Sequence, residues 1–312
     1  MQQQTRLSKF TKFAVFVLAY NIIVILWGVF LRASKSGDGC GQHWLTCHGE
    51  IIPSAPEIKT VIEFSHRLTS GLAFIAVLAL LIWAFRKFKK GSAVRKAALI
   101  SFVFIITEAL VGAGLVLTGN TAEALTPYRP YWAIGHLLNT FILLAALTMT
   151  VWFAGGGKSL KIKQKPKITL LLGLCVAGIL FVGITGSIAA LSTMLFETSG
   201  TLAEGLQKDF SADSPVLLRL RIFHPISSVL ISVFLIFVAG WLKKISQAEK
   251  NITRWTGVLS LLVLLQIIFG GLTLLTGAPI IMQLVHLFLA DAVWISFILM
   301  SAFFLSMDKE LP

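Results

Sequence analysis

Apolar residues in this chain are gathered into long blocks that are separated by shorter polar segments. Each block is about 20 residues long, the length of helix that crosses the apolar core of a bilayer. The pattern therefore predicts an all-α integral membrane protein with eight transmembrane helices. The predicted spans are 12–32, 62–85, 97–118, 131–154, 168–191, 222–242, 255–276 and 281–306.

Composition and charge agree with this class. Hydrophobic residues make up 56% of the chain and charged residues only 13%, which is too little charge for a soluble surface. The net charge of +13 is concentrated in segments that fall on one side of an eight-span topology, and the positive-inside rule makes that side cytoplasmic. We therefore expect a cell-membrane protein with both termini in the cytoplasm and no nucleic-acid partner. The basic segments are 6–12, 86–96, 158–167 and 243–254.

The two halves of the chain follow one plan. Because each half has an even number of spans, the halves share one orientation, unlike the inverted repeats of many secondary transporters. We expect two four-helix bundles, residues 1–160 and 161–312. The aligned pairs are Glu63 with Arg221, His66 with His224, Gly28 with Gly186, Glu108 with Gln266 and Gly112 with Gly270 at a shift of 158 residues, and His136 with His286 at a shift of 150.

Four of the six histidines lie at similar depths near the outer ends of predicted spans. An ionisable group inside a span is costly and marks a functional site by default. Any one of them could be a histidine that is hydrogen-bonded to a neighbouring helix, but two in each repeat favour a shared function. They are His66, His136, His224 and His286.

This histidine pattern favours haem over other metal sites. Neutral imidazole binds iron, copper and zinc, but zinc and copper usually take three or four protein ligands. Each half offers two histidines with no cysteine beside them. Two histidines on facing helices suit the axial positions of haem iron, because the porphyrin supplies the other four ligands. We expect each bundle to bind one haem near the outer face.

The two predicted sites differ. Glu63 lies three residues before His66, on the same helix face, whereas Arg221 has that place before His224 and Pro225 follows it. Glu63 is interpreted as a proton acceptor or charge stabiliser beside a reacting haem substituent. The alternative is a carboxylate that only orients His66 or lies at the membrane interface. The N-terminal half is therefore predicted to be the reaction site and the C-terminal half to hold an electron-carrying haem.

The first outer loop combines Cys40 and Cys47 with His43 and His48. Two cysteines on the oxidising side of a membrane favour a disulfide, which would stabilise this short loop by about 2.5 kcal/mol. A redox-active dithiol and a Cys/His metal site are the alternatives. The third cysteine, Cys175, lies inside a span and is expected to be ordinary packing.

Several other residues are candidates for lesser roles. Glu108 lies midway along the third span and should be protonated, paired or in contact with water, and the same holds for Asp291 in the eighth. Close helix packing is expected at Gly112, Gly114, Gly183, Gly186, Gly270 and Gly271. Haem-propionate pairing, or interfacial anchoring, is expected for Arg67, Arg129, Arg219 and Arg221.

The ordered motifs of the chain resemble the haem A synthase family. The resemblance runs over nearly the whole chain, and the set in this order is far more specific than any single piece. The motifs are GCGQHWLTCHGEIIP, EFSHRLTSG, EALVGAGLVLTG, GHLLNT, RIFHPISS, QIIFGGLTLLTG and LVHLFLAD.

The resemblance implies an oxidoreductase that converts the C8 methyl group of haem O to the formyl group of haem A, by successive hydroxylations and loss of water. It also implies a haem O synthase and the assembly of haem-copper oxidases as partners. By position, it matches His66 and His136 to the substrate-haem histidines, Glu63 to the functional carboxylate, His224 and His286 to the ligands of haem b, and Cys40 and Cys47 to the outer-loop cysteine pair.

One departure and two alternatives accompany the resemblance. Some family members carry a second cysteine pair in the outer loop of the C-terminal half, whereas segment 192–221 of this chain has no cysteine and carries Glu197, Glu204, Asp209 and Asp213. A mechanism that needs two dithiols is therefore not expected. The alternatives to a synthase are a non-enzymatic dihaem electron carrier and a haem exporter or chaperone.

Overall fold

The computed structural model describes residues 7–196 and 202–308, and its long elements are all α-helices. Eight of them are long and apolar enough to cross a membrane, which confirms the predicted spans. Their bounds are α1 Lys9–Ala33, α2 Ile58–Lys87, α3 Ala93–Leu117, α4 Arg129–Ala154, α5 Pro166–Leu195, α8 Phe223–Ile245, α9 Lys250–Leu275 and α10 Ile280–Ser306. The short elements are η1 Ile162–Gln164, α6 Leu202–Phe210 and α7 Val216–Leu220.

Several helices begin earlier than the apolar blocks because polar caps, rather than hydropathy, set their ends. The Ser8 side chain accepts a hydrogen bond from the Thr11 N–H at the start of α1, at 3.2 Å. Glu249 caps α9 in the same way, through Ile252 N–H at 2.9 Å. A side-chain acceptor satisfies N–H groups that have no partner in the first turn, so the helix continues into the charged segment.

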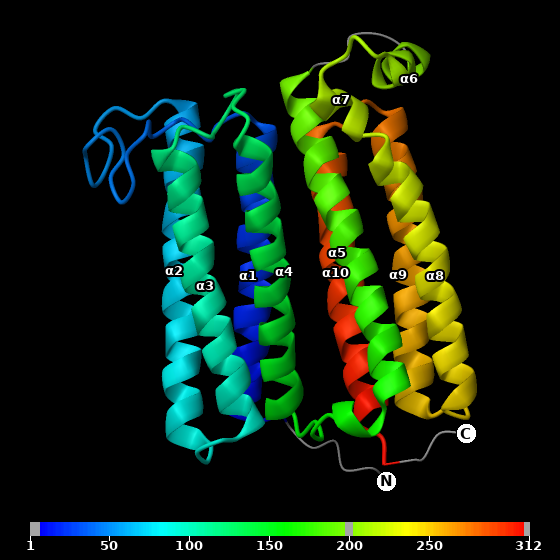
Figure 1. Ribbon diagram of the computed structural model, residues 1–312. Coiled ribbons are helices and arrows are strands. Elements are labelled where there is room, and N and C mark those ends of the chain that lie inside the picture. Colours follow the sequence, from blue (N-terminus) through cyan, green and yellow to red (C-terminus); the bar gives the residue numbers. More distant parts are fainter. Residues whose placement is uncertain (1–6, 197–201, 309–312) are drawn as a thin grey trace.

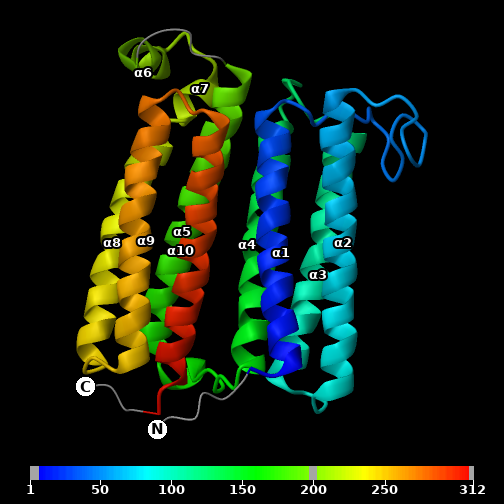
Figure 2. The same cartoon turned by 180° about the vertical axis from the view of Figure 1, so that it is seen from behind.

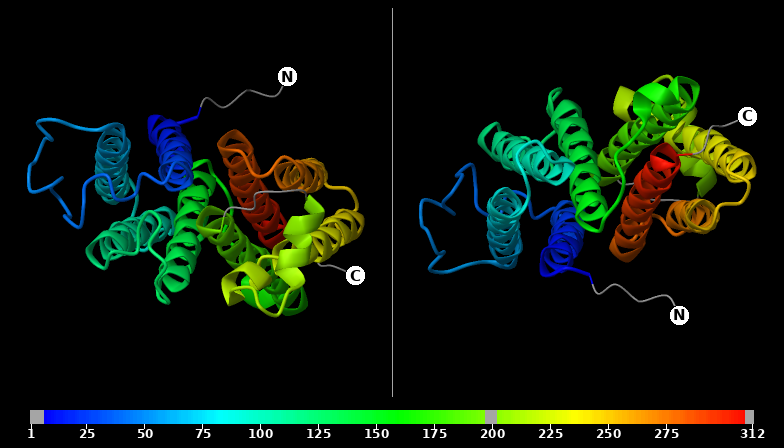
Figure 3. Two further views of the ribbon diagram at one scale, coloured as in Figure 1. Left: turned by 90° about the horizontal axis from the view of Figure 1, so that it is seen from above. Right: turned by 90° about the horizontal axis from the view of Figure 1, so that it is seen from below.

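The long helices stand nearly parallel in two groups of four, α1–α4 and α5 with α8–α10 (Figures 1 and 2). The view along the helices shows that α1 and α4 face α5 and α10 across the boundary (Figure 3). The α2–α3, α4–α5 and α8–α9 connections, which carry the basic segments, lie at the lower end in Figure 1. The α1–α2 loop lies at the opposite end, together with α6 and α7.

One buried hydrogen bond joins the two groups midway along their length. The indole N–H of Trp294 in α10 donates to the backbone carbonyl of Phe141 in α4, at 2.8 Å. The two rings also stack, with centroids 5.4 Å apart. On the outward faces, apolar side chains such as Ile23, Ile75 and Phe237 are 60–70% exposed, as expected of residues that contact lipid.

The segment between α5 and α8 differs from the plain outer loop expected from the sequence. It contains α6 and α7, and a break at Arg221–Ile222 separates α7 from α8. Pro225 falls in the first turn of α8, where its missing N–H leaves no helical hydrogen bond unmade. Glu197 lies outside the described residues.

Candidate functional site

The α1–α2 loop is closed by a disulfide between Cys40 and Cys47. Both cysteines are buried, and Cys47 and Glu50 exchange backbone hydrogen bonds of 2.7 and 2.9 Å. The Nε2 of His48 lies 2.9 Å from the carbonyl oxygen of Gly39 instead of joining the cysteines. The predicted disulfide between Cys40 and Cys47 is therefore confirmed, and His48 does not join the two cysteines in a metal site.

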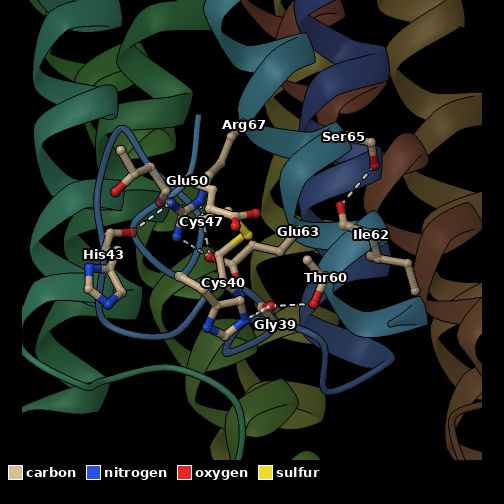
Figure 4. Close-up of a disulfide and its surroundings, with 12 residues drawn as sticks. Gly39, Cys40, His43, Cys47, Glu50, Thr60, Ile62, Glu63, Ser65 and Arg67 are labelled. Atoms are coloured by element: carbon tan, nitrogen blue, oxygen red, sulfur yellow. Dashed lines mark hydrogen bonds and ion pairs between the residues drawn. A yellow bond between two sulfur atoms is a disulfide. The ribbon is translucent and has the colours of Figure 1, made fainter. Parts of the chain in front are cut away.

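Glu63 lies directly beneath this loop, on the first turns of α2 (Figure 4). Its carboxylate is 2% exposed, accepts a hydrogen bond from the Cys40 backbone N–H at 2.8 Å and forms an ion pair with Arg67 one turn later. The hydrogen bonds of this carboxylate to described residues all go to Cys40 or Arg67, and none goes to His66. Glu63 therefore connects the disulfide loop to α2.

Two further features hold the loop on α2. Arg67 donates to the carbonyl oxygens of His43 and Thr46, at 2.6 and 2.7 Å (Figure 4). Gly39 lies so close to α2 that a Cβ atom there would overlap the backbone of Lys59. The loop thus packs closely against α2, and only glycine at position 39 permits this close approach.

The four intramembrane histidines all lie toward the disulfide-loop end of the molecule. His66, His136 and His286 occupy the first three turns of α2, α4 and α10, and His224 is the second residue of α8. These four helices begin at the upper end in Figure 1. Each imidazole is half-buried. The depth predicted from the sequence is therefore reproduced in both groups of helices.

Three of these imidazoles lie against a glycine of the neighbouring helix. A Cβ atom on each glycine would come within about 3 Å of the ring, closer than ordinary van der Waals contact. The absent side chain therefore provides the space that the imidazole fills. The pairs are Gly28 with His66 at 3.0 Å, Gly186 with His224 at 2.9 Å and Gly270 with His286 at 3.0 Å.

The imidazole rings of His224 and His286 are neighbours, with centroids 6.2 Å apart and nearly perpendicular planes at 84°. Two metal–imidazole bonds of about 2 Å and two ring radii of about 1.1 Å would place such centroids roughly 6 Å apart. The Nδ1 atoms of His66, His136 and His286 are buried without a hydrogen-bond partner among the described residues. These residues therefore fit the axial ligation of one haem between α8 and α10. Within 7–196 and 202–308, no group of three or more His, Cys, Asp or Glu side chains is arranged to hold a metal ion.

His136 is held by a carboxylate instead of a glycine. Its Nδ1 lies 3.1 Å from Oε1 of Glu108, and Gly112, the repeat counterpart of Gly270, has open space beside it. Glu108 also accepts hydrogen bonds from Asn139 and Thr140 of α4. Of the three states expected for Glu108, which were protonated, paired or in contact with water, the contacts favour pairing, because a candidate ligand lies at ion-pair distance.

The two imidazoles of the C-terminal group have longer polar contacts, and only with uncharged groups. Thr185 Oγ1 lies 3.4 Å from Nδ1 of His224 and 3.2 Å from Oγ of Ser227. The amide nitrogen of Gln266 lies 3.3 Å from Nε2 of His286. Neutral groups thus surround this pair, and no described carboxylate forms an ion pair with it.

Three of the four arginines considered as propionate partners bind protein groups. The guanidinium of Arg67 serves Glu63 and the disulfide loop, as described above, and that of Arg129 donates to carbonyls of the α3–α4 connection. Arg221 forms an ion pair with Asp209 at 2.6 Å, and Arg219 is exposed. Pairing of these arginines with haem propionates stays a prediction.

The remaining buried residues differ in their contacts. Cys175 lies in the apolar interior of the C-terminal group, so its assignment as packing is confirmed. Both oxygens of Asp291 are buried without a hydrogen-bond partner among the described residues, in contrast with the pairing of Glu108. Gly114 faces Trp132 as expected for close packing, whereas Gly271 has open space, so that expectation is wrong for Gly271, as it is for Gly112.

Sequence reasoning missed the residues that hold Glu108. His136, Asn139 and Thr140 lie on one face of α4 at positions i, i+3 and i+4, which is a readable signal for a shared site. Asp209, the partner of Arg221, had no such signal because 12 residues and a helix break separate the two.

A family profile described as COX15-CtaA, cytochrome oxidase assembly protein, matches residues 11–298. The chain belongs to this family. It is similar to the heme A synthase of Halalkalibacterium halodurans, with 31% identity over 85% of this chain and 87% of that protein. It is also similar to the heme A synthase of Bacillus cereus strain 03BB102, with 29% identity over 90% of this chain and 88% of that protein. The family resemblance found in the motifs is thereby confirmed.

A second kind of relative is longer. The chain is 41% identical to a Thermus thermophilus protein named protoheme IX farnesyltransferase, over 94% of this chain. The match covers only 48% of that protein, so the chain spans about half the length of this relative. A second strain of the same species has a protein with the same name, identity and coverage.

Proposed function

We propose that this membrane protein is a haem A synthase, which oxidises the C8 methyl group of haem O to a formyl group. The observation that carries the proposal is the His224–His286 pair, whose spacing suits two axial ligands of one iron, inside a chain that belongs to the COX15-CtaA family. The heme A synthases among its relatives cover most of its length.

The proposal assigns different roles to the two groups of helices. His66 and His136 hold the substrate haem O in residues 1–160, and His224 and His286 hold haem b in residues 161–312. A bound haem supplies the redox chemistry. The chain's residues hold the imidazoles in position, and the apolar helices around them exclude water.

The role proposed for Glu63 follows from its contacts. As the functional carboxylate of the N-terminal half, it couples the disulfide loop to the helix that carries His66, because Cys40 and Arg67 bind its oxygens. A direct proton transfer by Glu63 requires that one of these hydrogen bonds opens.

Orientation and partners are part of the proposal. The basic connections lie at one end of the molecule, and the positive-inside rule supports the proposal that this end and both termini are cytoplasmic, with the histidines toward the outer face. The farnesyltransferase name of the longer Thermus relative supports a partner that farnesylates haem, and the family description supports a role in cytochrome oxidase assembly.

The test is co-expression with a haem O synthase in a host without haem A, followed by haem extraction and mass analysis. Haem A or a hydroxylated haem O is expected with the wild-type chain. Unmodified haem b and haem O alone, in the presence of a working electron acceptor, would support the electron-carrier or haem-handover alternatives instead.

A further inference from the structure

We infer that Glu108 is a positioning residue that makes His136 a stronger electron donor than His286, so that iron in the N-terminal half has the lower midpoint potential. The inference rests on the proposed function in one respect only, namely that both histidine pairs bind haem. It does not depend on the reaction that the haem undergoes.

The first observation is the set of donors around Glu108. Oε1 lies 3.1 Å from Nδ1 of His136, Oε2 accepts from the amide nitrogen of Asn139 at 2.5 Å, and the hydroxyl of Thr140 donates to Oε1. Three polar groups of α4 therefore converge on one side chain of α3. The carboxyl group accepts at both oxygens. Nδ1 of His136 forms no hydrogen bond among the described residues and lies at ion-pair distance from Oε1, so the inference requires that an Nδ1–H turns toward Glu108 when Nε2 binds a metal.

The second observation is that the donors are themselves fixed. The amide oxygen of Asn139 accepts a hydrogen bond from Thr107 at 2.5 Å, and its amide nitrogen also donates to the Phe104 carbonyl at 2.8 Å. A reversed amide would lose these contacts, so the nitrogen must face Glu108. The single hydroxyl hydrogen of Thr140 is shared between Oε1 of Glu108 and the His136 carbonyl, which lies 2.9 Å away.

The third observation is that the C-terminal half lacks this network. The repeat places Gln266 where Glu108 lies, and Gln266 reaches His286 through its amide nitrogen at 3.3 Å. Gln266 thus approaches Nε2 of His286, whereas Glu108 approaches Nδ1 of His136, and the amide oxygen of Gln266 has no partner among the described residues. The counterparts of Thr107, Asn139 and Thr140 are Leu265, Leu289 and Ala290, none of which carries a polar side-chain atom.

The electronic consequence follows from general coordination chemistry. A carboxylate that accepts the Nδ1–H of a metal-binding histidine fixes the tautomer, leaves Nε2 for the metal and raises the basicity of the imidazole. A more basic axial ligand stabilises ferric iron relative to ferrous iron and lowers the potential. A neutral amide has no such effect. The two halves would therefore hold chemically similar haems at different potentials.

The experiment is a spectroscopic redox titration of the purified protein in nanodiscs, with the haem that it carries from the expression host. Glu108→Gln is expected to raise the midpoint potential of one of the two haem components by about 59 mV. This shift is a tenfold change in the equilibrium constant of a one-electron couple. The other component should stay in place. Ser101→Ala is the matched control, because Ser101 is buried in the same helix and its hydroxyl donates to the Ala97 carbonyl.

A reciprocal variant keeps the inference testable if Glu108→Gln does not fold. The reciprocal variant combines Gln266→Glu with Leu289→Asn and Ala290→Thr, which transfers the network to His286. It is expected to lower the midpoint potential of the other haem component, by a tenfold change in the equilibrium constant. If both variants retain haem with unchanged potentials, the inference is wrong while the proposed function stands. If His66→Ala and His136→Ala leave both components in place, the N-terminal haem site is wrong, and the inference is wrong with it.

Discussion

The carboxylate of Glu63 accepts a hydrogen bond from the backbone N–H of Cys40, at 2.8 Å, and so binds one residue of the loop disulfide directly to the helix that carries His66. This contact, together with the Arg67 ion pair, leaves the carboxylate with no described hydrogen bond to an imidazole. The effects of changing Glu63 should therefore appear first in the loop.

Replacement of Glu63 by alanine should leave bound haem in place and lower haem A formation about 100-fold if the carboxylate transfers a proton. It should also make the disulfide easier to reduce, because the Cys40 N–H and the Arg67 guanidinium lose a buried acceptor, which costs about 1–3 kcal/mol. Haem extraction and alkylation with mass detection measure the two effects. Glu57→Ala is the control, because Glu57 is exposed at the start of the same helix. Haem A at the wild-type rate would rule out a catalytic role for Glu63.

His224→Ala and His286→Ala should each remove the tightly bound haem b. The centroids of the two rings lie 6.2 Å apart, so the loss of one leaves the iron without an axial ligand on that side. Pyridine haemochrome spectra of the purified variants measure the occupancy. A normal bis-histidine spectrum in either variant would contradict the assignment of this pair.

Two adjacent glycines in α9 provide a matched test of whether the space beside Gly270 positions the imidazole of His286. A Cβ atom on Gly270 would lie 3.0 Å from Cε1 of His286, whereas one on Gly271 meets nothing within 4 Å. Gly270→Ala should therefore displace the ring and weaken haem binding by about 1–3 kcal/mol, the range for overpacking at a close contact. Gly271→Ala should bind haem like the wild type. Equal haem occupancy and equal spectra in the two variants would show that the space beside Gly270 is not needed to position His286.

The linker between the two helix groups should respond to acid. Asp308 pairs with Lys158 and Lys161 at 2.6 and 2.7 Å, and these cations lower its pKa from 3.8 to about 2. Because the folded pKa lies below the unfolded value, the stabilisation is complete above about pH 4 and is lost as the pH falls toward 2. A carbon-13 NMR titration of labelled aspartate should give a midpoint near 2, moving upward at 1 M salt. A midpoint of 3.8 at low salt would show that the pairs do not form in solution.

The sequence predicted the eight spans and the common depth of the four histidines because both depend on local properties, namely hydropathy and position within a block. It misplaced the starts of α2 and α9 by four and five residues, since charged residues at a helix end interrupt hydropathy without interrupting the helix. The α6 helix was missed because it lies in a polar segment. The α7 helix, Val216–Leu220, belongs to an apolar stretch that continues into α8, so hydropathy does not separate the two.

Partners across the chain were harder to predict. Glu63 was expected beside His66 on their shared helix face, but its carboxylate accepts a hydrogen bond from the backbone N–H of Cys40, 23 residues away. The loop conformation that brings Cys40 there is not determined by hydropathy. Glu108 was expected to be protonated, paired or in contact with water, and the i, i+3, i+4 spacing of His136, Asn139 and Thr140 could have identified its partners. Contacts within one helix face were thus readable, and contacts with loops were not.

The hydrogen bond from Trp294 to the Phe141 carbonyl connects α10, which carries His286, to α4, which carries His136. A tilt of either helix must therefore be shared by the other or break this bond. Occupation of one haem site should change the affinity of the other, and thermodynamic linkage requires the factor to be the same in both directions. In Trp294→Phe, the coupling between haem titrations of the two sites should weaken, although α1 and α4 still pack against α5 and α10 (Figure 3). With such cooperativity, the affinity of each site would depend on whether the other site holds a porphyrin.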